Sequence, residues 1–427
     1  MESNPPPVSF GEAFRFWLKL GFISFGGPTG QIAIMHQELV ERRRWISEGR
    51  FLHALNYCML LPGPEAQQLA TYIGWLMHRT WGGIVAGGLF VLPSVFILIA
   101  LSWIYVTWGN VPLVAGIFYG IKPAVTAIVV AAAHRIGSRA LKHPMLWAIA
   151  AAAFVAIFVV NLPFPAIVLA AGFLGYLGGR FFPGVFELKT GHQNQKSYGS
   201  ALIDDGTPTP PHALFSWRKL WGYAAAGLVL WALVLGGLLL AQGWEGTLTQ
   251  MGWFFTKAAL LTFGGAYAVL PYVFQGAVEH YGWLTALQMI DGLALGETTP
   301  GPLIMVVAFV GFLGAGVAGA LVATYFTFLP SFIFIFMGAP FIETTHGDLK
   351  FSAPLTGITA AVVGVILNLA VFFAWNVLWP GGMDGAFDWY SAAIGLAALV
   401  ALFRFKAGVM PMIGACALAG LATTFLL

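Results

Sequence analysis

Apolar residues dominate this chain and occur in long runs that are separated by short polar loops. About 20 apolar residues suffice for a helix to cross a bilayer, so the pattern predicts an all-α, polytopic membrane protein with nine to twelve membrane segments. Six runs precede one long polar stretch and seven follow it. The runs cover 12–35, 51–78, 83–106, 113–137, 145–160, 165–181, 221–241, 254–275, 286–313, 317–341, 353–379, 388–403 and 408–427.

The long polar stretch lies at about 183–219 and contains GHQNQKSYGSALIDDGTPTPPH. Its proline, glycine and polar content predicts a disordered linker more than a domain. We therefore divide the chain into four parts. They are a first transporter repeat over 1–182, a cytoplasmic linker over 183–220, a connecting transmembrane helix over 221–242, and a second repeat over 243–427.

The second part of the chain repeats the first. The motif FGG at 25–27 recurs at 263–265, and the motif PGP at 62–64 recurs at 300–302, both 238 residues later. After a one-residue deletion the offset is 237 for the rest of the matched region. One gap over more than a hundred residues indicates an internal structural repeat. Further matched pairs are Lys19 and Lys257, Trp45 and Trp283, Gly74 and Gly311, Pro93-Ser94 and Pro330-Ser331, and Gly120-Ile121 and Gly357-Ile358.

Equivalent loops of the two repeats differ in charge. The loop 36–50 holds four arginines, whereas its counterpart near 276–285 holds no Lys or Arg. The loop 134–143 is also basic, and its counterpart near 376–388 holds only two aspartates among the charged residues. Because Lys and Arg concentrate in cytoplasmic loops, the equivalent loops should face opposite sides of the membrane. The repeat is therefore predicted to be inverted.

The number of crossings refines this topology. Both basic loops of the first repeat should be cytoplasmic, so an even number of crossings separates them, although three apolar runs lie between. We expect the run 51–78, interrupted by PGP, to be a re-entrant hairpin of two half-helices. The run 12–35, broken at Gly26-Gly27-Pro28, is a second candidate hairpin. Four crossings then remain in each repeat, and the run 221–241 supplies the extra crossing that inversion requires.

The glycine-rich breaks are the candidate substrate site. Backbone breaks at bilayer depth persist where they are buried in protein or line a polar cavity, and half-helix N-termini in inverted repeats commonly face anionic groups. Four such termini present about two positive charges, which suits a dianion. The alternative is that the breaks are packing kinks, since Gly and Pro are frequent in membrane helices. The candidate substrate-binding residues are Gly26, Gly27, Pro28, Thr29, Gly30, Gln31, Gly63, Gln67, Gln68, Gly264, Gly265, Gly301, Lys19 and Lys257.

Charged residues inside the apolar runs form a second group of candidates. A lysine at a helix centre costs about 2.5–3.5 kcal/mol on insertion scales, which favours an interior or water-facing position for Lys122. Glu65, Asp291 and Glu297 lie in or beside the PGP segments, and we take them as candidates for proton coupling. Glu65 has a structural alternative, because it could cap the half-helix that follows Pro64. For Lys19 the alternative is snorkelling to the cytoplasmic interface.

Composition narrows the class of function. Charged residues make up 9% of the chain and apolar residues 59%, whereas soluble domains carry roughly 25% charged residues. The net charge of +3 gives no argument for nucleic acid. We find no HExxH, GxSxG or paired-aspartate motif, and the two cysteines form no metal-ligand spacing. A transporter is thus favoured over a membrane-embedded enzyme, with no cofactor and no metal, while an anion channel stays an alternative.

Two segments of the first repeat carry a family resemblance. SFGGPTGQIAIMHQELVERRRWISEGRF, followed by LLPGPEAQQLATYIGW, closely resembles the chromate transporter family. FGGAYAVLP with a later PGPL resembles the second half of the long, two-domain form. The resemblance covers about 12–180 and 254–427, and it marks Gly26 to Pro28, Arg42 to Arg44 and Pro62 to Gln68 as motif positions.

The resemblance implies a function that the residues alone do not. It implies a multi-pass protein of the bacterial inner membrane that exports chromate, with sulfate or another oxyanion as the alternative substrate. The implied partners are a chromate or sulfate-like oxyanion and membrane lipid, and a homodimer is left open. The second repeat departs from the first at Ala266, where the first has Pro28, and at Leu303, where the first has Glu65. Equal substrate roles for the two repeats are therefore not expected.

Overall fold

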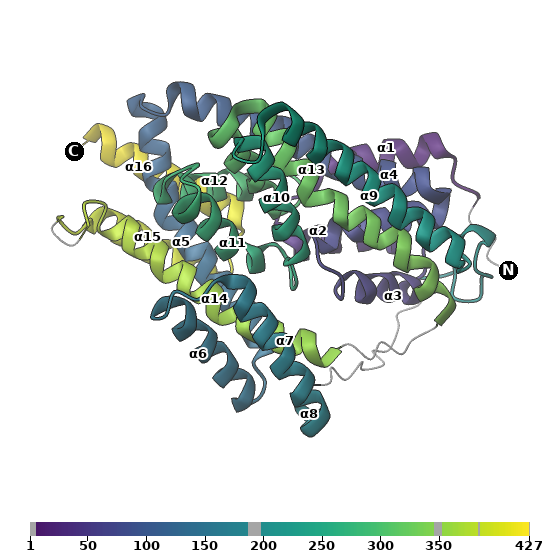
Figure 1. The fold of residues 1–427 in the computed structure, drawn as a ribbon. Helices are drawn as coiled ribbons and strands as arrows, with labels where there is room; N and C mark the ends of the chain where they lie inside the picture. Colours follow the sequence, from purple (N-terminus) through teal and green to yellow (C-terminus); the bar gives the residue numbers. More distant parts are fainter. Residues whose placement is uncertain (1–5, 187–197, 346–351, 383–384, 427) are drawn as a thin grey trace.

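A computed structural model describes residues 6–186, 198–345, 352–382 and 385–426. These residues are almost entirely helical, and no β-strand occurs among them (Figure 1). The all-α prediction is therefore confirmed. The first repeat contains α1 (Phe10–Ile23), α2 (Gly27–His36), η1 (Gln37–Arg42), α3 (Glu48–Cys58), α4 (Glu65–Trp108), α5 (Pro112–Ala140), α6 (Pro144–Phe158), α7 (Phe164–Phe181) and α8 (Pro183–Phe186).

The second repeat follows the same order of elements. A short 3₁₀ turn, η2 (Pro211–Ala213), and the long helix α9 (Trp217–Gln242) join it to the first. It contains α10 (Thr247–Leu260), α11 (Ala266–Phe274), η3 (Gln275–His280), α12 (Ala286–Thr298), η4 (Leu303–Met305), α13 (Val306–Thr345), α14 (Ser352–Leu378), α15 (Trp389–Phe403) and α16 (Val409–Leu426).

Local backbone irregularities recur at the sequence offsets of the repeat. The π-helical turns η1 and η3 begin 238 residues apart. Helix α4 leaves helical geometry at His78 and Arg79, and α13 does so 237 residues later, at Ala315 and Gly316. Arg79 and Gly316 both have positive φ, at 58° and 62°. The sequence repeat is thus a repeat of local structure as well.

These irregularities in α4 and α13 are sharp reversals. A Cβ added at Gly74 would lie 2.5 Å from the carbonyl oxygen of Gly82, and one added at Gly87 would lie 2.2 Å from the hydroxyl of Thr71. In a straight helix the first pair would be separated by about 12 Å along the axis. Residues 65–77 therefore fold back antiparallel onto 80–108. A Cβ at Gly311 would likewise lie 2.3 Å from the carbonyl oxygen of Gly319.

The two repeats pack against one another through their long helices. A Cβ added at Gly83 would lie 2.7 Å from the ring of Phe336, and one at Gly87 would lie 2.6 Å from that of Phe332. Because the residue number falls on α13 as it rises on α4, these equivalent helices run antiparallel. Helix α5 packs against α14, α15 and α16, and α14 packs against α5, α6 and α7. Each repeat thus places a long helix among helices of the other.

Among the described residues, six helices are long and apolar enough to cross a membrane, and three shorter apolar helices accompany them. The long ones are α4, α5, α7, α9, α13 and α14, and the shorter ones are α6, α15 and α16. Large apolar side chains such as Leu240 and Phe405 are exposed at 90% and 75%, as lipid-facing side chains would be. Together these features identify a multi-pass membrane protein, as the sequence predicted. Helices α1, α2, α3, α10, α11 and α12 are shorter, as the predicted half-helices require.

The polar stretch between the repeats differs from its prediction in part. Residues 198–213 pack against the loop after η1, where Leu202 and Ile203 donate backbone hydrogen bonds to the carbonyls of Arg44 and Trp45. Ser47 donates its backbone N–H to the carbonyl of Ile203 and its hydroxyl to Asp205. The expected disorder therefore does not hold there, because these polar groups find partners on the first repeat. Residues 187–197 lie outside the described residues.

Candidate functional site

Both glycine pairs interrupt a helix in the left-handed region of the backbone. Gly26 and Gly27 separate α1 from α2, with φ of 87° and 68°. Gly264 and Gly265 separate α10 from α11, with φ of 78° and 95°. L-residues with a Cβ rarely adopt these angles. The two glycine pairs are thus the helix interruptions that the sequence predicted.

The two PGP motifs interrupt a second set of helices in the same way. Gly63, between α3 and α4, has a φ of 133°, and Gly301, between α12 and η4, has a φ of 101°. The side of each glycine that a Cβ would fill is occupied by the other repeat. A Cβ at Gly63 would lie 2.3 Å from the hydroxyl of Ser331, and one at Gly301 would lie 1.9 Å from that of Ser94. These two serines are equivalent positions.

The breaks meet in pairs across the repeats. Gly63 donates its backbone N–H to the carbonyl of Thr262, which precedes the second glycine pair, at 2.7 Å. Gly301 makes the equivalent bond to the carbonyl of Ser24, which precedes the first glycine pair, at 2.8 Å. The hydroxyl of Ser94 also donates to the carbonyl of Pro300. The structure therefore brings all four breaks together, two and two, while their binding of an anion stays a prediction.

The glutamines of the motifs support the breaks. The amide nitrogen of Gln31 donates to the carbonyls of Ser24 and Gly301, and that of Gln68 donates to the carbonyl of Pro62 at 2.9 Å. Gln67 donates to the hydroxyl of Thr71 at 3.0 Å. The sequence suggested instead that these amides offer donors to a substrate. The amides of Gln31 and Gln68 thus donate to carbonyls at the breaks, whereas that of Gln67 donates within α4. The role of all three as direct ligands stays a prediction.

The two repeats differ in how much of their breaks is accessible. Gly26 and Thr29 are exposed in the first repeat, where Gly27, Pro28, Gly30 and Glu65 are partly exposed. In the second repeat Gly265 and Gly301 are buried, and Gly264 is partly exposed. A Cβ added at Gly265 would lie 4.0 Å from a carboxylate oxygen of Glu65. An accessible surface thus reaches the break at Gly26–Gly27, whereas Gly63 is buried like Gly301. The Glu65 carboxylate lies between the break at Gly63 and the break at Gly265.

The other two candidate acids are buried and hydrogen-bonded. Asp291, on α12, accepts a hydrogen bond of 2.8 Å from the Tyr105 hydroxyl and lies 3.5 Å from the Lys122 ammonium group. Its second oxygen is buried with no hydrogen-bond partner. Glu297 accepts a hydrogen bond from the Tyr267 hydroxyl. Lys122, which the sequence placed inside an apolar run, is therefore stabilised by a carboxylate of the other repeat.

The two equivalent lysines lie away from the contacts that join the breaks. Lys19 is exposed on α1. Lys257, on α10, is half-buried, and its ammonium group lies 5.8 Å from the centre of the Trp253 ring, one turn earlier on the same helix. Interaction with a tryptophan face compensates part of the cost of a buried cation. Direct contact of either lysine with a substrate stays a prediction.

A further charged cluster was not found by sequence reasoning. Arg50, on α3, lies 2.9 Å from Glu343, on α13, and Glu343 accepts a hydrogen bond from the Tyr72 hydroxyl. The Arg50 and Glu343 side chains are only 9% and 1% exposed. Arg50 looked like one of four loop arginines, and Glu343 lies just past an apolar run. The closeness of Glu343 to that run was the signal in the sequence that could have indicated a buried carboxylate.

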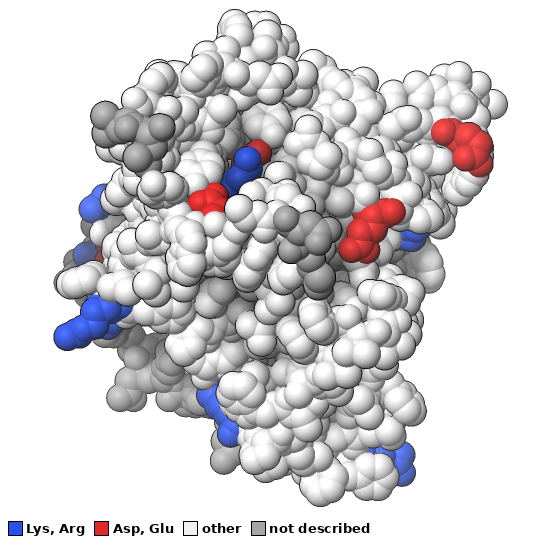
Figure 2. All heavy atoms as spheres, turned by 90° about the vertical axis from the view of Figure 1, so that its left-hand side faces the viewer, with Lys and Arg blue, Asp and Glu red and all other residues white. Residues whose placement is uncertain are grey.

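The surface offers few other sites. Figure 2 shows a face that is largely uncharged, on which acidic and basic side chains lie next to one another in a hollow.

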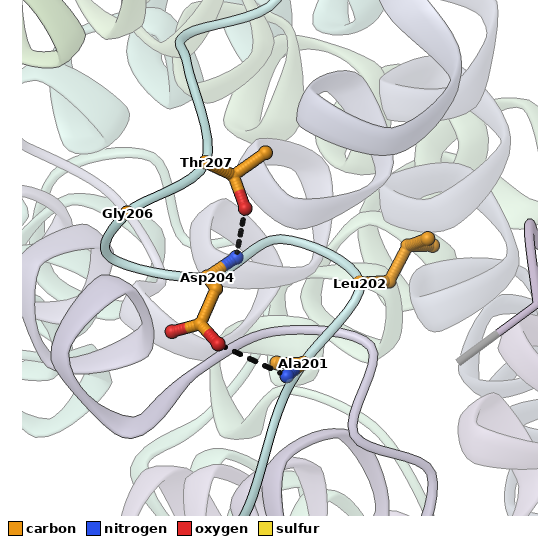
Figure 3. A pocket seen from close by; sticks show the side chains of 5 residues that line it. All are labelled: Ala201, Leu202, Asp204, Gly206 and Thr207. Atoms are coloured by element: carbon orange, nitrogen blue, oxygen red, sulfur yellow. Dashed lines mark hydrogen bonds between the residues drawn. The ribbon is translucent and has the colours of Figure 1, made fainter. Parts of the chain in front are cut away.

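A pocket of about 530 Å³ is lined by Ala201, Leu202, Asp204, Gly206 and Thr207 (Figure 3). The Asp204 carboxylate accepts a hydrogen bond there from the backbone N–H of Ala201, and the backbone N–H of Asp204 donates to the hydroxyl of Thr207. None of the candidate site residues lines it. Across the described ranges, no three His, Cys, Asp or Glu side chains form a group that could hold a metal ion.

Comparison with known proteins gives consistent matches along the chain. The family described as chromate transporter matches residues 11–176 and 249–421. A chromate transport protein of Cupriavidus metallidurans is 31% identical over 97% of this chain and 94% of its own length. A chromate transport protein of Pseudomonas aeruginosa is 37% identical over 86% of this chain and 81% of its own length. An uncharacterised transporter of Methanocaldococcus jannaschii is 26% identical over 88% of this chain and 87% of its own length. No solved structure matches.

Proposed function

The chain belongs to the chromate transporter family, and we propose that it is a secondary active transporter that exports chromate across a bacterial inner membrane. The family consists of membrane transport proteins and not of enzymes. The observation that carries the proposal is the meeting of the four breaks, through the paired bonds from Gly63 to Thr262 and from Gly301 to Ser24.

The chemistry of the breaks suits an oxyanion. Helix α2 begins at the accessible break at Gly26–Gly27, and α4 begins at Glu65, which is partly exposed. The first N–H groups of each helix have no partner within the helix. Each N-terminus carries roughly half a positive charge, and the positive φ of Gly26 and Gly27 lets the backbone approach an anion without a Cβ in the way. A tetrahedral dianion such as chromate can accept several of these N–H groups at once. Sulfate shares this shape and charge and is the alternative substrate.

We propose that the repeats are inverted in the membrane and that transport proceeds by alternating access. Two observations support this. The equivalent helices α4 and α13 run antiparallel, as the contacts of Gly83 with Phe336 and of Gly87 with Phe332 indicate. The loops at 36–50 and 276–285 differ in charge as loops on opposite sides do. In a pair of inverted repeats, the inward-open and outward-open states interconvert when the two repeats exchange their conformations.

Proton coupling is proposed through Glu65, Asp291 or Glu297. Glu65 has the best position, because it is partly exposed and lies near Gly265 of the other repeat. A proton taken up or released there changes the charge beside the helix N-termini to which the substrate would bind. Protonation of Glu65 and binding of an anion would then be coupled. Replacement of all three acids by amides should abolish the pH dependence of transport, and an unchanged pH dependence would exclude this coupling.

The proposed function is tested by chromate uptake into inside-out vesicles that contain the chain. An imposed pH gradient should drive chromate accumulation above its external concentration, and empty vesicles serve as the control. Uptake that only ever runs downhill at the rate of a channel would contradict secondary transport. Competition by excess sulfate measures the preference between the two oxyanions. Chromate sensitivity of cells with and without the chain then tests whether the physiological substrate is chromate.

A further inference from the structure

An ion pair joins α12 of the second repeat to α5 of the first. Asp291 and Lys122 lie 3.5 Å apart, with side chains 3% and 24% exposed, and Tyr105 at the end of α4 donates a hydrogen bond to the same carboxylate oxygen. Within the described residues, Lys122 is the cation that pairs with Asp291. Helix α12 packs along α5 at this point. The pair therefore holds a half-helix of the candidate site against a long helix of the other repeat.

The equivalent contact of the first repeat is not made. The counterparts of Asp291, Lys122 and Tyr105 are His53, Thr359 and Ile342. The Nε2 atom of His53 lies 3.4 Å from the carbonyl oxygen of Ile342. These two counterparts are therefore in contact, as Asp291 and Tyr105 are. Within the described part of the chain, however, α3 has no packing against α14 comparable to that of α12 against α5. One of the two equivalent interfaces is closed by an ion pair, and the other lacks both of these charges, since among the described residues α3 is joined to α13 through Arg50 and Glu343 and not to α14.

The accessibility of equivalent residues follows the same asymmetry. Asn56 and Met59, on α3, are exposed. Their counterparts on α12, Ala294 and Glu297, are 1% and 7% exposed. Both pairs lie at the end of a half-helix that runs into a PGP break. The end of α3 is thus accessible beside the break of the first repeat, although Gly63 itself is buried, whereas the end of α12 is buried beside the break of the second.

We infer that the Lys122–Asp291 pair is a gate that closes one side of the substrate site and that this structure is open on the other side. The inference rests on the proposed function. Separation of the pair leaves a buried charge without its partner, which is strongly unfavourable. The gate therefore opens when Asp291 is neutralised, or when a substrate oxyanion replaces Asp291 beside Lys122. Lys122 and Asp291 act as positioning residues, because they control access and need not touch the substrate at the breaks.

The test measures the accessibility of single cysteines on the two sides. In a chain carrying Cys58→Ala and Cys416→Ala, a cysteine is introduced by Asn56→Cys or by Ala294→Cys and treated with a membrane-impermeant maleimide. With the gate intact, position 56 reacts and position 294 does not. Asp291→Asn or Lys122→Met should raise the labelling rate at position 294 by about tenfold or more, since loss of one partner destabilises a buried pair. That labelling should come from the side opposite to the side that labels position 56.

Two further variants make the test decisive. Asp388→Asn removes an acid whose two carboxylate oxygens lie 2.7 Å and 2.8 Å from the hydroxyl of Tyr119, also on α5. It keeps a residue able to cap α15. It should leave position 294 unreactive, and labelling there would contradict the gate. The reversed pair, Lys122→Asp with Asp291→Lys, should restore the sealed state, and labelling as in the single variants would contradict it too. If Asp291→Asn still takes up chromate and its position 294 stays unreactive, the gate is excluded while the proposed function stands. If the unmodified chain takes up no chromate, the proposed function itself is excluded.

Discussion

Replacement of Gly301 by alanine tests whether the crossed breaks are required for transport. Gly301 has a φ of 101°, and a Cβ there would lie 1.9 Å from the hydroxyl of Ser94. The substitution therefore forces alanine into a strained conformation and pushes Ser94 away from the carbonyl of Pro300, to which it donates a hydrogen bond. The nearby bond from Gly301 to Ser24 would weaken as the break shifts.

The size of the effect follows from these contacts. A residue with a Cβ held in a sparsely populated backbone region costs on the order of 1–3 kcal/mol. Loss of one buried hydrogen bond costs about 0.5–1.5 kcal/mol. The transport-competent state is thus destabilised by about 1.5–4.5 kcal/mol. Since about 1.4 kcal/mol corresponds to a factor of ten, the initial rate should fall by about 12-fold to about 1,600-fold.

The assay is the initial rate of chromate uptake into vesicles, with thermal unfolding in detergent measured on the same preparations. Gly88→Ala is the matched control, because a Cβ at this position of α4 meets nothing within 4 Å. Gly63→Ala should behave like Gly301→Ala, since a Cβ there meets the equivalent Ser331 at 2.3 Å. If Gly301→Ala transports within about twofold of Gly88→Ala, the spread expected of a neutral substitution, the reasoning is refuted.

Three other predictions follow from single side chains. Glu65→Gln should abolish accumulation driven by a pH gradient while downhill chromate flux remains, as vesicle uptake would show. Glu343→Gln leaves Arg50 buried without its partner, so stability in detergent should fall by about 3–5 kcal/mol, and Arg50→Met in the same chain should recover most of it. Burial lowers the pKa of His212 below 6.5, so the unfolded chain takes up the proton first. Stability should be full above that pH and fall as the pH decreases through it, and His212→Gln should flatten the profile of melting temperature against pH.

The fold class and the four breaks could be predicted because their signals are local. Apolar runs define the helices, and FGG and PGP mark positions where only glycine tolerates the backbone. The reversals in α4 and α13 also had a local signal, because the predicted apolar runs change there, from 51–78 to 83–106 and from 286–313 to 317–341. His78 and Arg79 in α4, and Ala315 and Gly316 in α13, leave helical geometry at these boundaries.

The contacts between the repeats could not be predicted, because they depend on how distant helices pack. Lys122 and Asp291 were both recognised as charges in apolar runs, but nothing in the sequence pairs them. The glutamine amides could serve a substrate or the chain itself. The structure directs the N–H groups of Gln31 to the carbonyls of Ser24 and Gly301. Such choices follow from the positions of freed carbonyl groups, which exist only once both repeats are folded.

The position of bound chromate tests the central claim most directly. Chromium scatters X-rays anomalously, so a chromate-soaked crystal of the full chain locates the anion without reference to the protein. If the breaks bind the substrate, we expect a chromium peak between the breaks at Gly26–Gly27 and at Pro62–Gly63–Pro64, within hydrogen-bond distance of backbone N–H groups. A peak confined to the arginine cluster at 42–44, with the breaks unoccupied at chromate concentrations that saturate transport, would contradict it.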